Sequence, residues 1–106
     1  MNYACRTQDI PLGEGRAVTL DGRRIAIFRT PDEGWFALDA VCPHRGGPLA
    51  DGIVCERAVI CPLHDRRFDL QSGAPLSAGD GVAAHTVEVR GERVYVALAG
   101  ARRHAA

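Results

Sequence analysis

The sequence reads Cys-Pro-His at 42–44 and Cys-Pro-Leu-His at 61–64, with sixteen residues between the two motifs. Each motif offers one sulfur and one imidazole, and a turn-forming segment follows each. Thiolate and imidazole ligands at these spacings suit tetrahedral zinc or an iron–sulfur cluster in which two histidines replace two cysteines. The segment 41–75 therefore predicts a metal site. Its expected ligands are Cys42, His44, Cys61 and His64.

Length and charge limit what else the chain can do. Its 106 residues suffice for one domain, so any chemistry beyond the metal site belongs to a partner protein. Thirteen basic side chains, all arginine, balance thirteen acidic ones, and no basic stripe suggests nucleic acid. No leader-like apolar run opens the chain, and no span of about 18 apolar residues could cross a membrane. We expect a soluble, cytoplasmic protein.

The four cysteines are expected to be reduced. Two disulfides would suit a secreted protein, but two of these cysteines stand at metal-ligand spacing from histidines. Cys5 and Cys55 have no histidine or cysteine at such a spacing. A lone cysteine is most often a small, partly buried hydrophobic residue, so neither is assigned a role.

Strands are expected on both sides of the metal-binding segment and within it. The dipeptide Asp21-Gly22 suits the positive φ angles of a tight hairpin turn, and period-2 alternation is clear near the C-terminus. No window of 11 or more residues has a helical period, so the chain is predicted to be all-β. The expected strands are 16–20, 23–29, 35–38, 53–54, 58–60, 67–70, 85–90 and 93–98.

The order of these strands predicts a single domain, 1–106. Residues 1–40 and 77–106 would form an antiparallel base, a β-sandwich or barrel, into which a small metal-binding subdomain, 41–76, is inserted. Because exposed strand edges need pairing, we expect the C-terminal hairpin to close against the first hairpin.

The two ligand motifs, with the glycines after the first and Arg-Phe-Asp at 67–69, resemble those of Rieske proteins. The resemblance is good over 25–75. It implies the Rieske fold, in which a rubredoxin-like subdomain carries a 2Fe-2S cluster with two cysteines on one iron and two histidines on the other. By this resemblance Cys42 and Cys61 bind the inner iron, and His44 and His64 bind the outer iron, where electrons enter and leave. Pro75 would shield the cluster.

The resemblance also bears on the reduction potential. Replacing two thiolates by imidazoles raises the potential of such clusters to about −150 to +300 mV. The Rieske proteins of cytochrome bc complexes have a disulfide between the ligand loops, where this chain has Gly47 and Leu63. They also have serine and tyrosine hydroxyls that donate to cluster sulfurs, where this chain has Arg66 and Phe68. We therefore predict a potential in the lower part of the range.

Other residues receive simpler interpretations. His85 and His104 have no ligand-spaced partner and are expected at the surface, whereas Trp35 and Phe36 are expected in the core. Many Rieske relatives have glycine and an aromatic residue directly after the last histidine, where this chain has an Asp-Arg pair at 65–66, so partner recognition there stays open. Four arginines are expected on a solvated face of the sheet or, alternatively, in a patch that docks an acidic partner. They are Arg16, Arg23, Arg24 and Arg29.

At finer detail, the stretches 42–49, 51–54 and 67–70 look most like the small subunit of NAD(P)H-dependent assimilatory nitrite reductases. That resemblance implies an electron-transfer component without a catalytic centre of its own, bound to the reductase large subunit. The alternative is the ferredoxin component of an aromatic-ring dioxygenase, between a flavin reductase and an oxygenase. An alternative of another class is a zinc-bound or metal-free interaction module. An oxygenase in its own right is excluded on length, because no mononuclear iron site with two histidines and a carboxylate is left over once the cluster ligands are assigned.

Overall fold

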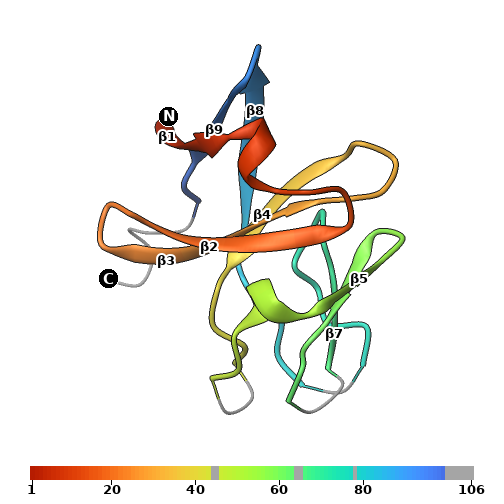
Figure 1. Ribbon diagram of the computed structural model, residues 1–106. Helices are drawn as coiled ribbons and strands as arrows, with labels where there is room; N and C mark the ends of the chain where they lie inside the picture. Colours follow the sequence, from red (N-terminus) through yellow and green to blue (C-terminus); the bar gives the residue numbers. More distant parts are fainter. Residues whose placement is uncertain (44–45, 64–65, 78, 100–106) are drawn as a thin grey trace.

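The computed structural model describes residues 1–43, 46–63, 66–77 and 79–99 (Figure 1). Within these ranges the chain forms nine strands and two short 3-10 turns. The strands are β1 (Asn2–Arg6), β2 (Glu14–Leu20), β3 (Arg23–Arg29), β4 (Trp35–Asp39), β5 (Ile53–Cys55), β6 (Ala58–Ile60), β7 (Arg67–Asp69), β8 (Ala84–Arg90) and β9 (Arg93–Ala97); the 3-10 turns are η1 (Thr7–Asp9) and η2 (Leu49–Asp51). The predicted all-β class is confirmed. The described part of the chain has no helix long and apolar enough to cross a membrane.

The strands form two antiparallel sheets. The larger has six strands in the order β1-β9-β8-β4-β3-β2, and the smaller has three in the order β5-β6-β7. The larger sheet curves until β1 contacts β2, so it is close to a closed barrel (Figure 1). The smaller sheet lies in the lower half of the view, and η2 packs against β2 and β3.

The first hairpin follows the sequence closely. β2 and β3 pair in continuous register from Glu14 opposite Arg29 to Leu20 opposite Arg23. The turn residues Asp21 and Gly22 have φ angles of 54° and 77°, the left-handed conformation that a two-residue hairpin turn requires. The predicted turn is therefore confirmed.

The C-terminal hairpin pairs differently from the expectation. β8 pairs with β4 rather than with the first hairpin, and β9 pairs with β1, a strand that the sequence did not predict. β1 is only five residues long, and its register shifts between Tyr3 and Cys5. Such a bulge breaks the period-2 alternation by which strands are recognised.

The core lies on both faces of β3 and β4. On one face Ala26, Phe28 and Leu38 belong to a cluster that reaches into the smaller sheet, and on the other Ile25 and Ile27 pack inside the barrel. Strands buried on both faces read as continuous apolar runs, which explains the unbroken Ile-Ala-Ile-Phe run at 25–28. Trp35 and Phe36 are partly buried, one against each cluster, so their predicted core role is confirmed.

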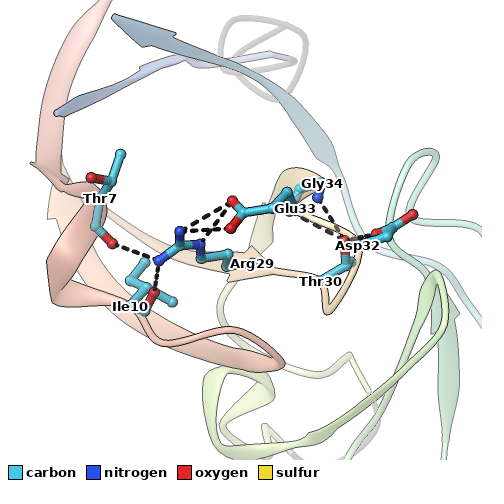
Figure 2. Close-up of polar contacts among 7 residues, drawn as sticks. All are labelled: Thr7, Ile10, Arg29, Thr30, Asp32, Glu33 and Gly34. Carbon is cyan, nitrogen blue, oxygen red and sulfur yellow. Dashed lines mark hydrogen bonds and ion pairs between the residues drawn. The ribbon is translucent and has the colours of Figure 1, made fainter. Parts of the chain in front are cut away.

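Arg29 does not lie on a solvated face as predicted, because residues 7–10 fold over it (Figure 2). Its guanidinium donates to the carbonyl oxygens of Thr7 (3.2 Å) and Ile10 (3.0 Å) and to the carboxylate of Glu33. It also lies 5.1 Å from the centre of the Trp35 ring. Arg29 therefore ties the N-terminal segment to the central strands.

The turn after β3 is closed by a buried threonine (Figure 2). The Thr30 hydroxyl accepts a hydrogen bond of 2.8 Å from the Gly34 N–H and donates to the Asp32 carboxylate. The bond from Thr30 is the main cause that lowers the pKa of Asp32 below its ordinary value. A Cβ atom at Gly34 would lie 2.7 Å from the Thr30 hydroxyl, so the turn requires glycine there.

The sequence predicted His85 at the surface, but its side chain is fully buried. Its Nδ1 accepts a 2.9 Å hydrogen bond from the Ala99 N–H, so Nε2 carries the proton and donates to Asp39, also at 2.9 Å. Arg23 bonds to both the Asp39 carboxylate and the Ala99 carbonyl oxygen. No local pattern predicts this network, because its members are far apart in the chain. Of the other predicted surface residues, Arg16 and Arg24 are exposed, and His104 lies outside the described residues.

We expect the substitution Arg29→Met to lower the free energy of unfolding by about 2 kcal/mol, because partly buried acceptors lose a charged donor. Arg24→Met, an exposed position on the same strand, should change it by less than about 0.5 kcal/mol. Chemical denaturation followed by circular dichroism measures both values. Equal losses in the two variants would show that the contacts of Arg29 with residues 7–10 do not stabilise the fold.

Candidate metal centre

The first ligand motif leaves β4 in a tight loop. Residue Val41 forms an isolated bridge with Pro48, and the Cys42 N–H donates to the Gly47 carbonyl oxygen at 2.8 Å. The Gly46 N–H returns a hydrogen bond of 2.9 Å to the Cys42 carbonyl oxygen. The Cys42 side chain is buried. The loop is thus closed on itself with its cysteine directed away from solvent.

The second ligand motif repeats this arrangement after β6. The Cys61 N–H donates to the carbonyl oxygen of Arg66 at 2.7 Å, five residues further on, as Cys42 does to Gly47. Cys61 is completely buried. Two loops of similar closure therefore each present a buried cysteine at their first position.

Gly47 brings the two loops into contact. A Cβ atom at this position would lie 2.8 Å from the Cys61 sulfur and 3.2 Å from Leu63 Cδ1. Real Cβ atoms essentially never approach a neighbour within 3.0 Å, so this approach requires glycine. Leu63 packs over Gly47 at the two positions where, by the resemblance, cytochrome bc proteins have a disulfide. An apolar contact holds the loops together here.

All four cysteines lie in the described part of the chain, and none forms a disulfide. Cys42 and Cys61 belong to the same core cluster, together with Phe68. Cys5 is buried in the barrel, and this burial is the main cause that raises the pKa of its thiol. Cys55 is exposed in the β5–β6 hairpin and so is not the partly buried residue that was expected. The two cysteines at ligand spacing therefore share one buried cluster.

The predicted histidine ligands, His44 and His64, lie outside the described residues, as does Asp65. The structure thus brings together the two cysteines of the predicted ligand set, and the two histidines remain predictions. In the sequence His44 follows the located Cys42 by two residues, and His64 follows the located Cys61 by three.

A third segment, 71–82 without residue 78, packs beside β7 and the end of the second ligand loop. Gly73 donates to the Asp69 carbonyl oxygen and accepts from the Val82 N–H, each at a distance of 2.8–2.9 Å. A Cβ atom at Gly73 would lie 2.0 Å from the Val82 carbonyl oxygen. Pro75 is exposed and bridges to Phe68 of β7. The sequence predicted the turn at 71–75 but not its contact with Val82.

The side chain of Arg66 joins the second ligand loop to this third segment. A Cβ atom at Gly79 would lie 2.9 Å from its Nη1 atom. Arg67, the next residue, donates its N–H to the Ser77 hydroxyl at 3.2 Å. The second ligand loop is therefore supported from the side by residues that follow it in the chain.

An exposed aliphatic side chain stands on each of the three segments. These three residues are Val41, Leu63 and Leu76, which are 53%, 55% and 56% exposed. Each lies within two residues of an exposed proline at 43, 62 or 75. Sequence reasoning missed this apolar rim, although an apolar residue beside each turn, outside any strand alternation, is a signal that could have indicated it.

The located residues fit an iron–sulfur cluster. Two cysteines from separate loops belong to one buried cluster of side chains. Because residue 47 is glycine, the space beside the Cys61 sulfur is not occupied by a side chain. Thiolate ligands bind both iron–sulfur clusters and zinc, so the geometry of the sulfurs alone leaves both open.

Comparison with known proteins separates these possibilities. The model of one family, the Rieske-like [2Fe-2S] domain, matches residues 2–97. The ferredoxin component of a naphthalene 1,2-dioxygenase system from Pseudomonas aeruginosa is 33% identical over 92 residues, which are 85% of this chain and 88% of that protein.

Solved structures of two kinds superpose on almost the whole chain. A protein of Mycobacterium tuberculosis assigned as the small subunit of an NADH-dependent nitrite reductase has a TM-score of 0.86 and 29% identity, and the match covers 93% of this chain and 95% of that one. The ferredoxin of carbazole 1,9a-dioxygenase from Nocardioides aromaticivorans has a TM-score of 0.82 and 28% identity, with 92% and 98% covered. This chain therefore belongs to the family of Rieske-like [2Fe-2S] domains, and its cofactor is a Rieske-type 2Fe-2S cluster.

Proposed function

We propose that this protein is the electron-transfer small subunit of an NAD(P)H-dependent nitrite reductase. Its cluster ligands in this proposal are Cys42, His44, Cys61 and His64. The observation that carries the electron-transfer function is the meeting of two similarly closed loops, at which Gly47 lies against the Cys61 sulfur. The zinc-bound or metal-free alternative has no support from the family match.

When bound, the cluster supplies reversible one-electron chemistry. The chain holds it with two thiolates, which bind as deprotonated sulfurs, and with two neutral imidazoles. Burial of Cys42 and Cys61 keeps water from the sulfurs, and the hydrogen bonds that close each loop restrict their movement. A rigid site of this kind changes little between oxidation states, which favours fast electron transfer.

In this proposal residues 41–76 form the cluster-binding subdomain, and residues 1–40 and 77–106 form the base. The pairing of β5, β6 and β7 in a sheet of their own supports this division, since the strands of the larger sheet all come from outside that segment. Cysteines without disulfides suit a reducing compartment, so the expected location is the cytoplasm.

The apolar rim of Val41, Leu63 and Leu76 suits contact with a redox partner at the end of the molecule that holds the cluster. Exposed apolar side chains beside a binding site suit contact with a partner protein. The partner in this proposal is the large subunit of the reductase.

The structural match to the nitrite reductase small subunit supports this partner, with the TM-score of 0.86. A second candidate is the ferredoxin component of an aromatic-ring dioxygenase, which passes electrons from a flavin reductase to an oxygenase. The 33% identity to the naphthalene dioxygenase ferredoxin favours it.

Reconstitution with purified partners distinguishes the two candidates. The reduced protein is mixed in a stopped-flow instrument with the nitrite reductase large subunit of its own organism, or with a ring-hydroxylating oxygenase of that organism. We expect NAD(P)H-dependent nitrite consumption to require this protein and to be lost in Cys61→Ala. Fast reoxidation by the oxygenase, with no effect on nitrite consumption, would refute the proposal in favour of the second candidate.

Cys61→Ala should abolish the visible absorption of the cluster, because a buried thiolate ligand is lost. The variant should also contain at most half of the iron bound by the wild type. Cys55→Ala, at an exposed cysteine of the neighbouring hairpin, is the matched control and should keep both signals. Absorption spectra and iron analysis of the two purified variants test this. A full cluster spectrum in Cys61→Ala would contradict the ligand assignment.

Gly47→Ala should shorten the lifetime of the cluster by about tenfold or more, since the added methyl group would press on the Cys61 sulfur. Gly46→Ala provides the control. Gly46 has a φ of 71°, so alanine there costs about 1 kcal/mol of backbone strain, but its Cβ would meet nothing closer than 3.7 Å. The decay of visible absorption in the presence of a chelator gives both rates. A faster decay in Gly46→Ala would show that backbone strain, not the sulfur contact, matters.

Phe68→Tyr should raise the midpoint potential from the lower part of the Rieske range. By the resemblance, the new hydroxyl stands where relatives donate to a ligand sulfur, and a hydrogen bond to a charged group worth about 1.5 kcal/mol corresponds to roughly 60 mV for one electron. Phe36→Tyr, in a partly buried aromatic residue of β4, should leave the potential unchanged. Spectroelectrochemical titration measures both. A wild-type midpoint near +300 mV would contradict the predicted low potential.

A further inference from the structure

Three arginines form one row across adjacent strands of the larger sheet. Arg93 of β9 is the direct partner of Arg6 on β1 and of Arg90 on β8. Directly opposed residues of antiparallel strands point to the same face with their Cβ atoms about 5 Å apart, and like charges at such positions are destabilising. The fold therefore holds three positive charges together at a cost in stability.

Acidic neighbours compensate only the two outer arginines. Arg6 forms an ion pair of 3.5 Å with Glu92, and Arg90 pairs with Glu88. All four side chains are largely exposed, and exposed pairs of this kind contribute little. The side chain of Arg93, in the middle of the row, forms no hydrogen bond or ion pair with any residue in the described ranges.

Two tyrosines stand beside the arginine row. Tyr3 and Tyr95 are cross-strand partners whose rings meet edge to face at 5.8 Å, and the Arg90 guanidinium lies 4.9 Å from the centre of the Tyr95 ring. Together with the arginines and the β8–β9 turn they line an open groove of about 830 Å³. Tyrosine and arginine are the residue types most enriched at the energetically important centres of protein interfaces.

This groove is remote from the cluster-binding loops. β1, β9 and the far end of β8 lie at the top of the molecule, whereas β5 and β7, next to the ligand loops, lie at the bottom (Figure 1). A partner held in the groove would leave the apolar rim accessible.

We propose that this groove docks an acidic segment of the larger subunit, with carboxylates on one face of a helix. Neighbouring strands are about 4.8 Å apart, which matches the 5–6 Å between side chains at i and i+4 on a helix. A helix laid across the strands would therefore present one carboxylate to each arginine. Arginine binds carboxylates in a bidentate manner, and occupancy would relieve the repulsion within the row.

The identity of the partner rests on the proposed function. A subunit that stays bound needs an anchoring surface besides its electron-transfer end. A carrier that alternates between a reductase and an oxygenase can present the same end to each in turn. Anchoring at the arginine row would therefore suit a small subunit better than a shuttling ferredoxin.

Two synthetic helical peptides of identical composition test the docking surface. One has glutamates on a single face at i, i+4 and i+7, and the other has them distributed around the helix. Each is titrated into the ¹⁵N-labelled holoprotein, and amide chemical shifts are followed by NMR. We expect the one-faced peptide to bind at least tenfold more tightly and to shift the amides of β1 and of residues 90–95.

Charge variants complete the experiment. Arg93→Glu should abolish binding of the one-faced peptide, and Arg24→Glu, at an exposed arginine of β3, should preserve it. Arg93→Gln should also weaken binding at least fivefold while raising the melting temperature, because it removes the repulsion within the row. An effect of Arg24→Glu as large as that of Arg93→Glu, or equal binding of both peptides, would overturn the proposal.

The titration needs no nitrite reductase, so the two proposals can fail separately. If the one-faced peptide binds selectively but nitrite consumption does not require this protein, the proposed function is refuted and the docking surface is kept. Nitrite reduction that is unaffected by Arg93→Glu, together with unselective peptide binding, would refute the docking surface and keep the function.

Discussion

The approach of Gly47 to the Cys61 sulfur is the contact on which the rest of the site depends. It joins two loops that leave different strands, and the 2.8 Å that a Cβ would have to that sulfur excludes any larger residue. Each loop is closed by a hydrogen bond from its cysteine N–H to a carbonyl oxygen five residues later, so the sulfurs are held by backbone geometry. Both cysteines are buried in the cluster that includes Phe28 of β3. The core of the base and the metal centre are therefore one packed unit.

Much of the fold could be predicted because its signals are local. The turn at Asp21-Gly22, the alternation in β9 and the short β5–β6 hairpin all depend on residues close together in the chain. β1 could not be predicted, since its bulge removes the alternation that reveals a strand. The burial of His85 and the partial burial of Arg29 depend on distant partners. His85 bonds to Asp39 and Ala99, and Arg29 bonds to carbonyl oxygens of the N-terminal segment. No local sequence pattern predicts these long-range contacts.

The site was predictable to a similar depth. Ligand spacing and family resemblance indicated four residues, and the structure brings the two cysteines together, while both histidines lie outside the described residues. The turn at 71–75 was predicted, but its contact with Val82 and the apolar rim were missed, because they depend on how separate segments pack and not on a local pattern. Loop contacts of this kind follow from the assembled fold. The same is true of the arginine row, whose members lie on three strands.

In the proposed site two cysteines and two histidines hold the cluster. Pulsed electron paramagnetic resonance of the reduced protein, with ¹⁵N only in histidine, detects the histidine ligands. Ligation by His44 and His64 predicts hyperfine couplings from two directly bound histidine nitrogens, with one coupling lost in His44→Ala or in His64→Ala if a cluster still assembles. A cluster signal without any strong ¹⁵N coupling would refute histidine ligation, since it would require ligation by other residues.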